Sequence, residues 1–337
     1  MISVRFKQTY AKTYAEDFTK RRGRASLGYI DEAEYLAHCR GIYDRLCEGK
    51  PLAEQVGTWL TRLDAPGELT YRDALLADDI PGLNDSLFQT AAITHARQVW
   101  SSGTDHCRSY RTVTQVLAAG MFDRVPLLLP EELGLSADGH PDIVAQTNLF
   151  MALWYRREDF ARTARAQGER RLEVKGSNLQ KAEVRYLLAL LDDDPEMASA
   201  QLLEYVTAVA RISEFGVGPL QKLFWPFAHG LYNLAWQVWP EGRAQSLALP
   251  EHERFCADLA RWQVENGFPA ATLRIHYPEP MGLINTILTT APPPARLHQP
   301  YLSDPDMQHL KSKRLYDADR FRRELIVAIT DGAASQE

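Results

Sequence analysis

The chain has 337 residues, of which 45% are hydrophobic and 24% charged, and its formal net charge is −6. This is an ordinary globular composition, sufficient to build a sizeable core. The acidic excess argues against a general nucleic-acid binder, which needs a basic face for phosphates, so we expect no direct nucleic-acid contact.

The chain also lacks the sequence features of a membrane or secreted protein. No window approaches about 20 apolar residues, and the first residues contain no apolar core of a signal peptide. None of the four cysteines forms a CxxC pair, so we expect all of them to be reduced. We therefore predict a cytoplasmic protein that makes no membrane contact.

Helical spacing of apolar residues begins near the N-terminus and continues through the first third of the chain. Asp31, followed by Glu34, is typical of a helix cap, and Thr104 is the predicted cap of the helix that carries Tyr110. We predict that residues 1–125 form an N-terminal helical bundle. Its helices are expected at 4–22, 31–46, 52–63, after Thr70, and at 85–100.

A proline-bounded loop, Pro126 to Pro141, separates this bundle from a second predicted region at 140–290. Residues 150–161 can be laid over 186–198 at an offset of 36 to 37, close to the roughly 34 residues of a helix-turn-helix repeat. The pattern predicts antiparallel helix pairs of the tetratricopeptide kind. The expected helices are 142–156, 158–168, 177–191, 195–213 and 219–238. Their expected core residues are Trp154, Leu187, Leu190, Leu203, Phe224 and Leu231.

The last part of the chain is predicted to hold two further helices. One should begin at Pro250 and run to Glu265, and the other should cover about 315–329 within a C-terminal segment at 300–330. Because strand-like alternation is almost absent, the predicted fold class is all-α with negligible sheet. The three regions could be separate or form one continuous domain.

The motifs of common active sites are missing from the sequence. There is no nucleophile elbow, P-loop or dinucleotide glycine pattern. Asp105, His106 and Cys107 are adjacent, so on a helix they diverge by about 100° each and cannot all face one metal ion. His229 lies in an apolar helix and is interpreted as a core histidine. We therefore expect no catalytic residue, no cofactor and no metal site.

Two acidic clusters are the candidate partner-binding residues. One is the predicted turn with Asp192, Asp193, Asp194 and Glu196, and the other contains Asp304 and Asp306. Acidic side chains at a helix start also oppose the positive end of the helix dipole, so a purely structural role is the alternative for the first cluster.

Short phrases of the second region carry a family resemblance. They are Leu149–Phe160, Lys181–Leu191 and Pro226–Ala235, and with their helical pattern this part of the chain resembles the immunity protein 49 family. The resemblance implies an all-α cytoplasmic antitoxin that binds one cognate secreted bacterial toxin, often a nuclease. It supplies no catalytic residues.

Two other functions stay open at this stage. A helical-repeat scaffold would show regular repeats along the whole chain, whereas two copies are visible here. An enzyme with an unrecognised pocket would need a polar cluster that spacing in one sequence does not reveal.

Overall fold

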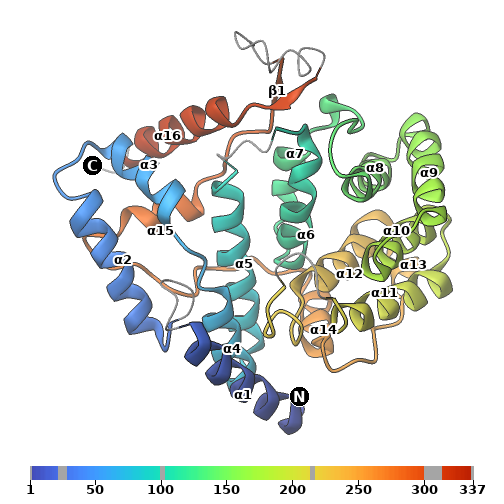
Figure 1. The fold of residues 1–337 in the computed structure, drawn as a ribbon, viewed down its shortest axis with the longest axis horizontal. Coiled ribbons are helices and arrows are strands. Elements are labelled where there is room, and N and C mark those ends of the chain that lie inside the picture. The colour runs from blue at the N-terminus through green and yellow to red at the C-terminus, as the bar shows by residue number, and fades with distance from the viewer. Residues whose placement is uncertain (1, 22–28, 99–102, 213–216, 300–312, 335–337) are drawn as a thin grey trace.

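The computed structural model describes residues 2–21, 29–98, 103–212, 217–299 and 313–334 (Figure 1). The structure is 67% helical, and its described residues hold 16 α-helices and one sheet of two short strands. The predicted all-α class with negligible sheet is confirmed. None of the described helices has both the length and the apolar character needed to cross a membrane.

The described part of the N-terminal half begins with five helices. They are α1 (Val4–Arg21), α2 (Glu32–Leu46), α3 (Leu52–Arg62), α4 (Gly67–Ala77) and α5 (Ile80–Ala96). Helix α1 packs on α4, and α4 packs on α5. Asp31 caps α2 as predicted, because its carboxylate accepts a hydrogen bond from the backbone N–H of Glu34 at 2.9 Å.

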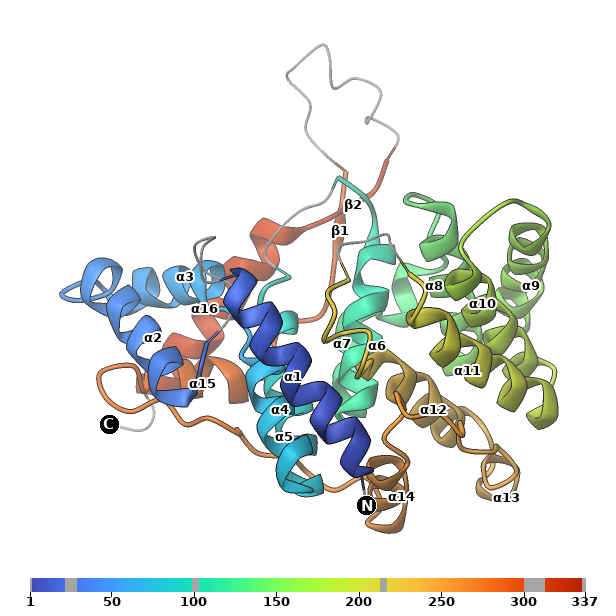
Figure 2. The ribbon, with the colours of Figure 1, turned by 60° about the horizontal axis from the view of Figure 1, so that its bottom comes forward.

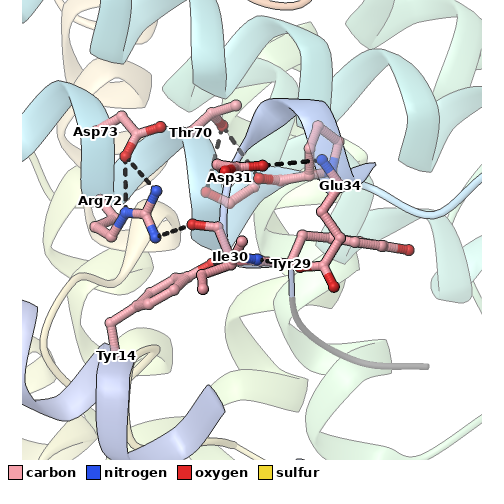
Figure 3. Close-up of polar contacts among 10 residues, drawn as sticks. Tyr14, Tyr29, Ile30, Asp31, Glu34, Thr70, Arg72 and Asp73 are labelled. Atoms are coloured by element: carbon pink, nitrogen blue, oxygen red, sulfur yellow. Dashed lines mark hydrogen bonds and ion pairs between the residues drawn. The ribbon is translucent and has the colours of Figure 1, made fainter. Parts of the chain in front are cut away.

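A polar junction fastens the backbone before α2 to α1 and α4 (Figure 3). The Arg72 guanidinium of α4 lies 4.3 Å from the centre of the Tyr14 ring of α1 and donates a hydrogen bond to the Ile30 carbonyl at 2.8 Å. The Tyr14 hydroxyl donates to the Tyr29 carbonyl at 2.5 Å. These contacts fix the start of α2 against α1, the preceding helix, and against α4, whose Arg72 is 42 residues from Ile30.

Helix α6 (Tyr110–Ala118) lies at the centre of the molecule, preceded by the short helix η1 (His106–Ser109). The cap predicted at Thr104 for the helix that carries Tyr110 is wrong. Ser109 precedes α6 and makes no side-chain cap hydrogen bond. The side-chain cap belongs to η1, where the Asp105 carboxylate accepts a hydrogen bond from the Cys107 N–H at 2.9 Å. After α6 the chain forms η2 (Phe122–Arg124), α7 (Val125–Leu128) and η3 (Glu131–Leu133).

Two helix pairs follow, α8 (Pro141–Tyr155) with α9 (Glu158–Glu173) and α10 (Asn178–Leu191) with α11 (Pro195–Val209). Helix α10 also packs on α8, so the pairs are stacked (Figure 2). Arg156 and Asp193 occupy matching turns and both adopt left-handed backbone, with φ of 53° and 56°. The two copies seen in the sequence therefore share a turn conformation as well as a helix pattern.

Helix α12 (Pro226–Val238) crosses α6 at very short range. A Cβ atom on Gly230 would come closer to the Thr114 carbonyl oxygen than the 3.0 Å that real Cβ atoms keep. Asn233 donates hydrogen bonds to the Leu117 carbonyl at 2.9 Å and to the Gln263 side-chain oxygen at 3.0 Å. At the crossing, the two backbones are in contact, and buried side-chain amides form hydrogen bonds.

The C-terminal part of the chain returns to the N-terminal helices. It forms α13 (Glu241–Ala244), α14 (Ala257–Glu265), α15 (Leu283–Thr289), β1 (Leu297–His298), β2 (Leu315–Tyr316) and α16 (Ala318–Ala334). Helices α14 and α15 pack on α5, and α16 packs on α3. One continuous set of buried apolar side chains reaches from Phe6 to Ile329. The proposed division at 1–125, 140–290 and 300–330 stays a prediction.

Two predicted helix starts are wrong. The helix expected at 219–238 begins at Pro226, and the helix expected from Pro250 begins at Ala257. Residues 250–256 instead form turns, and the Arg254 side chain there donates a hydrogen bond to the Lys222 carbonyl at 2.6 Å. Proline suits the first turn of a helix, but it does not start one where tertiary contacts hold the chain in another shape.

Four of the six predicted core residues are buried, namely Leu187, Leu190, Phe224 and Leu231. Trp154 is only partly buried, because it stacks on Phe150 at the last turn of α8 and leaves an edge to solvent. Leu203 is exposed, so its predicted burial is wrong. It follows Leu202, which is fully buried, and the step of about 100° per residue turns Leu203 outward.

Replacing Gly230 with alanine should destabilise the protein by about 2–3 kcal/mol, since the added methyl group forces α6 and α12 apart. Thermal or denaturant unfolding would measure the change. Gly242 of α13 is the matched control, because no atom lies within 4 Å of the place that an added methyl group would take and alanine should be tolerated there. Equal stability of the two variants would contradict a close crossing.

Candidate functional site

The predicted acidic turn joins α10 to α11, and three of its four acidic residues have partners within the chain. Asp192 forms an ion pair with Arg165 at 2.5 Å, and Asp193 pairs with Arg243 at 2.9 Å. The Asp194 carboxylate accepts a hydrogen bond from the Met197 N–H at 2.9 Å and so caps α11. The turn therefore has a structural role, as the alternative interpretation of the sequence allowed.

The same acidic side chains are still accessible to a partner. Asp192, Asp193, Asp194 and Glu196 are all exposed, and ion pairs at such positions are screened by water. Asp304 and Asp306 lie outside the described residues, so the second predicted cluster is not placed. Only the first cluster has a defined geometry.

Helix α11 carries an exposed face that begins at this turn. We call Glu196, Met197, Ala200, Leu203 and Glu204 the α11 face, since all five are exposed and they recur at helical spacing. Met197 is 48% exposed and Leu203 is 38% exposed. The face thus joins apolar side chains with two carboxylates at its edges.

A second site lies on the opposite, buried side of α11, around Glu183 of α10. The Glu183 carboxyl accepts hydrogen bonds from the Tyr110 hydroxyl of α6 and from the Gln146 amide of α8, both at 2.8 Å. It faces a hollow of about 30 Å³, which we call the Glu183 hollow. The hollow is also lined by Arg111, Thr114, Gln180, Tyr205, Trp225 and Phe227.

Burial raises the pKa of Glu183 from its ordinary value of 4.5 to about 7, against smaller opposing effects of the Tyr110 hydrogen bond and the Arg111 charge. A buried carboxyl with a shifted pKa beside a hollow is a feature that is frequent at functional sites and also occurs in structural networks.

Glu183 is not among the predicted site residues, although its position in the sequence carries a usable signal. Leu179, Ala182, Tyr186 and Leu190 mark the buried stripe of α10, and Glu183 falls on that stripe rather than on the exposed side. A carboxyl group at a core position needs partners, because burying a charge without them is costly. Those partners come from α6 and α8, which sequence spacing does not bring into view.

The histidine and cysteine positions have structural roles. The Asp105 carboxylate accepts hydrogen bonds from the backbone of Cys107, Ala137 and Asp138 and thereby holds a loop. Burial lowers the pKa of His229 to about 3 and raises that of the Cys256 thiol to about 11. The two groups therefore stay neutral at pH 7 and do not form a thiolate–imidazolium pair. Among the described residues, no group of three or more His, Cys, Asp or Glu is placed to hold a metal ion.

Two larger hollows lie in the N-terminal half. One of about 490 Å³ follows α3, where Arg322 of α16 lies over Gly57. The other, of about 320 Å³, separates the start of α1 from α14, and its Asp258 and Arg261 pair with each other at 3.0 Å. Both are large enough for a small molecule, but the described residues that line them include no buried carboxyl group like Glu183.

Comparison with family models, with curated proteins and with solved structures found no match for this chain.

The pKa of Glu183 leads to a prediction about stability and pH. Because the folded protein holds the Glu183 proton more tightly than the unfolded chain, this group should stabilise the fold less as pH rises from about 4.5 to 7. Glu183→Gln removes that titration. The variant should therefore gain up to about 3 kcal/mol relative to the unsubstituted protein across this range.

Urea unfolding at several pH values would measure the difference between the two proteins. The exposed Glu196→Gln is the matched control, because water surrounds Glu196 in the folded state as well as in the unfolded chain. If the difference in the free energy of unfolding between Glu183→Gln and the unsubstituted protein stays constant with pH, the raised pKa of Glu183 is contradicted.

Proposed function

We propose that this protein is an antitoxin of the immunity-protein kind, which binds a secreted bacterial toxin in the cytoplasm and neutralises it by tight contact. The family resemblance of the second region motivates this function. The observation that carries the binding surface is the α11 face, where apolar side chains are exposed next to acidic ones.

The apolar part of the α11 face suits the centre of an interface. Met197 and Leu203 are on one helix and within two turns of each other, so a partner can cover both at once. Exposed apolar side chains with a polar rim are typical of protein-binding surfaces. Burying the pair would slow dissociation.

The charged part suits a basic partner. Glu196 and Glu204 flank the apolar side chains, and the exposed Asp192 and Asp193 continue the acidic surface into the turn. Nuclease toxins commonly need basic surfaces for phosphate, and opposite charge speeds association with such a surface. A nuclease is therefore the kind of toxin that we propose, and the protein would either cover its active site or distort its fold.

A helical-repeat scaffold is the second candidate function. The stacked pairs α8–α9 and α10–α11 with matching left-handed turns support it. Repeats of this kind offer extended binding surfaces to other proteins. Both candidate functions depend on binding another protein. An antitoxin neutralises the toxin that it binds, whereas a scaffold only holds its partner.

The first test addresses the apolar residues of the α11 face. Met197→Ala with Leu203→Ala should weaken binding of the cognate toxin, to be sought among the products of neighbouring genes, by roughly tenfold or more, mainly through faster dissociation. Surface plasmon resonance would measure both rates. Val327→Ala on α16 is the matched control, because Val327 is at least as exposed but lies far from α11 in the fold. Equal dissociation rates for the two variants would remove the α11 face from the interface.

The second test addresses charge. Glu196→Gln with Glu204→Gln should slow association about threefold to tenfold at low salt and much less at high salt, because rim charges act through long-range attraction. Asp194 is left unchanged, since removing this cap would cost about 1 kcal/mol of stability. Association that is unaffected at both salt concentrations would show that these carboxylates do not steer the partner.

Survival of cells that express the toxin distinguishes the antitoxin from the scaffold. Cells that express the cognate toxin should live only when this protein is co-expressed, and the Met197 and Leu203 double variant should protect them less. Binding without protection would favour the scaffold.

A further inference from the structure

The Glu183 hollow brings together a buried carboxyl group and aromatic rings from several helices. Tyr110 comes from α6, Tyr205 from α11 and Phe227 from α12, while Trp225 directly precedes α12. The Trp225 and Phe227 rings are 4.7 Å apart, and the Trp225 indole N–H donates to the Tyr205 hydroxyl at 3.0 Å. These contacts fix the aromatic walls independently of any ligand.

The carboxyl group has room for a further donor. Among the described residues, each Glu183 oxygen accepts one hydrogen bond, from Tyr110 or from Gln146, whereas a carboxylate offers about four lone-pair sites. Both donors are neutral side chains, so the negative charge of the ionised group is not balanced by them. Arg111 also lines the hollow and offsets only part of the effect of burial.

We propose that the Glu183 hollow is a binding site for a primary ammonium group, carried either by a lysine side chain or by a small alkylamine. The Glu183 carboxylate supplies the opposite charge, and aromatic rings that line a site favour a cation beside them. The hollow, at about 30 Å³, exceeds the roughly 10–15 Å³ that one water-sized group needs, and an ammonium group is of that size.

This inference is independent of the proposed function. Tyr205 belongs to the buried side of α11, whereas Leu203 and the rest of the α11 face point to solvent. A ligand in the hollow therefore does not occupy the α11 face, and either proposal can fail without the other.

Propylammonium chloride is the probe, and 1-propanol is its neutral counterpart of nearly equal shape. The readout is the indole N–H resonance of Trp225 in a two-dimensional NMR titration, assigned with Trp225→Phe. We expect a saturable shift with propylammonium and none with 1-propanol. Equal shifts with both compounds would overturn the proposal, and this comparison needs no variant that alters the hollow.

Two variants then test the charges. Glu183→Gln keeps the size and hydrogen-bonding capacity of the side chain but removes its charge, so it should weaken propylammonium binding at least about tenfold. Arg111→Gln removes a competing positive charge from an exposed position and should strengthen binding about threefold. Unchanged affinity in Glu183→Gln, with helix content preserved by circular dichroism, would overturn the proposal.

A short peptide identifies the source of the ammonium group. A Gly-Lys-Gly peptide with blocked ends should shift the Trp225 resonance, and the same peptide with an acetylated lysine should not. If propylammonium binds but the lysine peptide does not, the site is assigned to a free amine. Binding of the acetylated peptide as tightly as the unmodified one would contradict recognition of charge.

Discussion

The backbone contact between α6 and α12 at Gly230 and Thr114 is the constraint on which the rest of the arrangement depends. Helix α6 packs at once on α5, on α8 and on α12, and so connects the two halves of the molecule. The absence of a Cβ at Gly230 allows α6 and α12 to approach to backbone distance, which brings the flanking side chains into register. Moving α12 outward would separate the N-terminal helices from the helix pairs.

Buried amides fix that crossing in one position. The Gln263 amide of α14 donates to the Asn84 side chain of α5 and to the Ala118 carbonyl of α6, and its oxygen accepts from Asn233 of α12. Apolar packing alone tolerates sliding, whereas a buried amide that loses its partner costs about 1–3 kcal/mol. This network explains how segments that are far apart in sequence keep a single mutual placement.

The Tyr110–Glu183–Gln146 contacts extend the same principle to the helix pairs. They link α6, α10 and α8, but here the central group is a carboxyl rather than an amide. A glutamine at this position would also hold the helices together, and its charge would not change with pH. Packing of the three helices therefore does not require an ionisable group at this position. For this reason we connect the Glu183 carboxyl group with ligand binding. The acidic turn shows the opposite case, since capping by Asp194 and the ion pairs of Asp192 and Asp193 already account for the local structure.

Features that arise from residues near each other along the chain could be predicted from the sequence alone. Helical spacing predicted the all-α class, Asp31 with Glu34 predicted the start of α2, and the repeated pattern predicted the pairs α8–α9 and α10–α11. Tertiary structure decided which side of a helix is covered, as Leu203 and Trp154 demonstrate, and where the chain leaves helical form before Pro226 and Ala257. It also decided that Glu183 lies beside Tyr110 and Gln146. Caps and periodicity involve residues within a few positions of each other, whereas burial, the Gly230 crossing and the Glu183 hollow depend on helices brought together from distant parts of the chain.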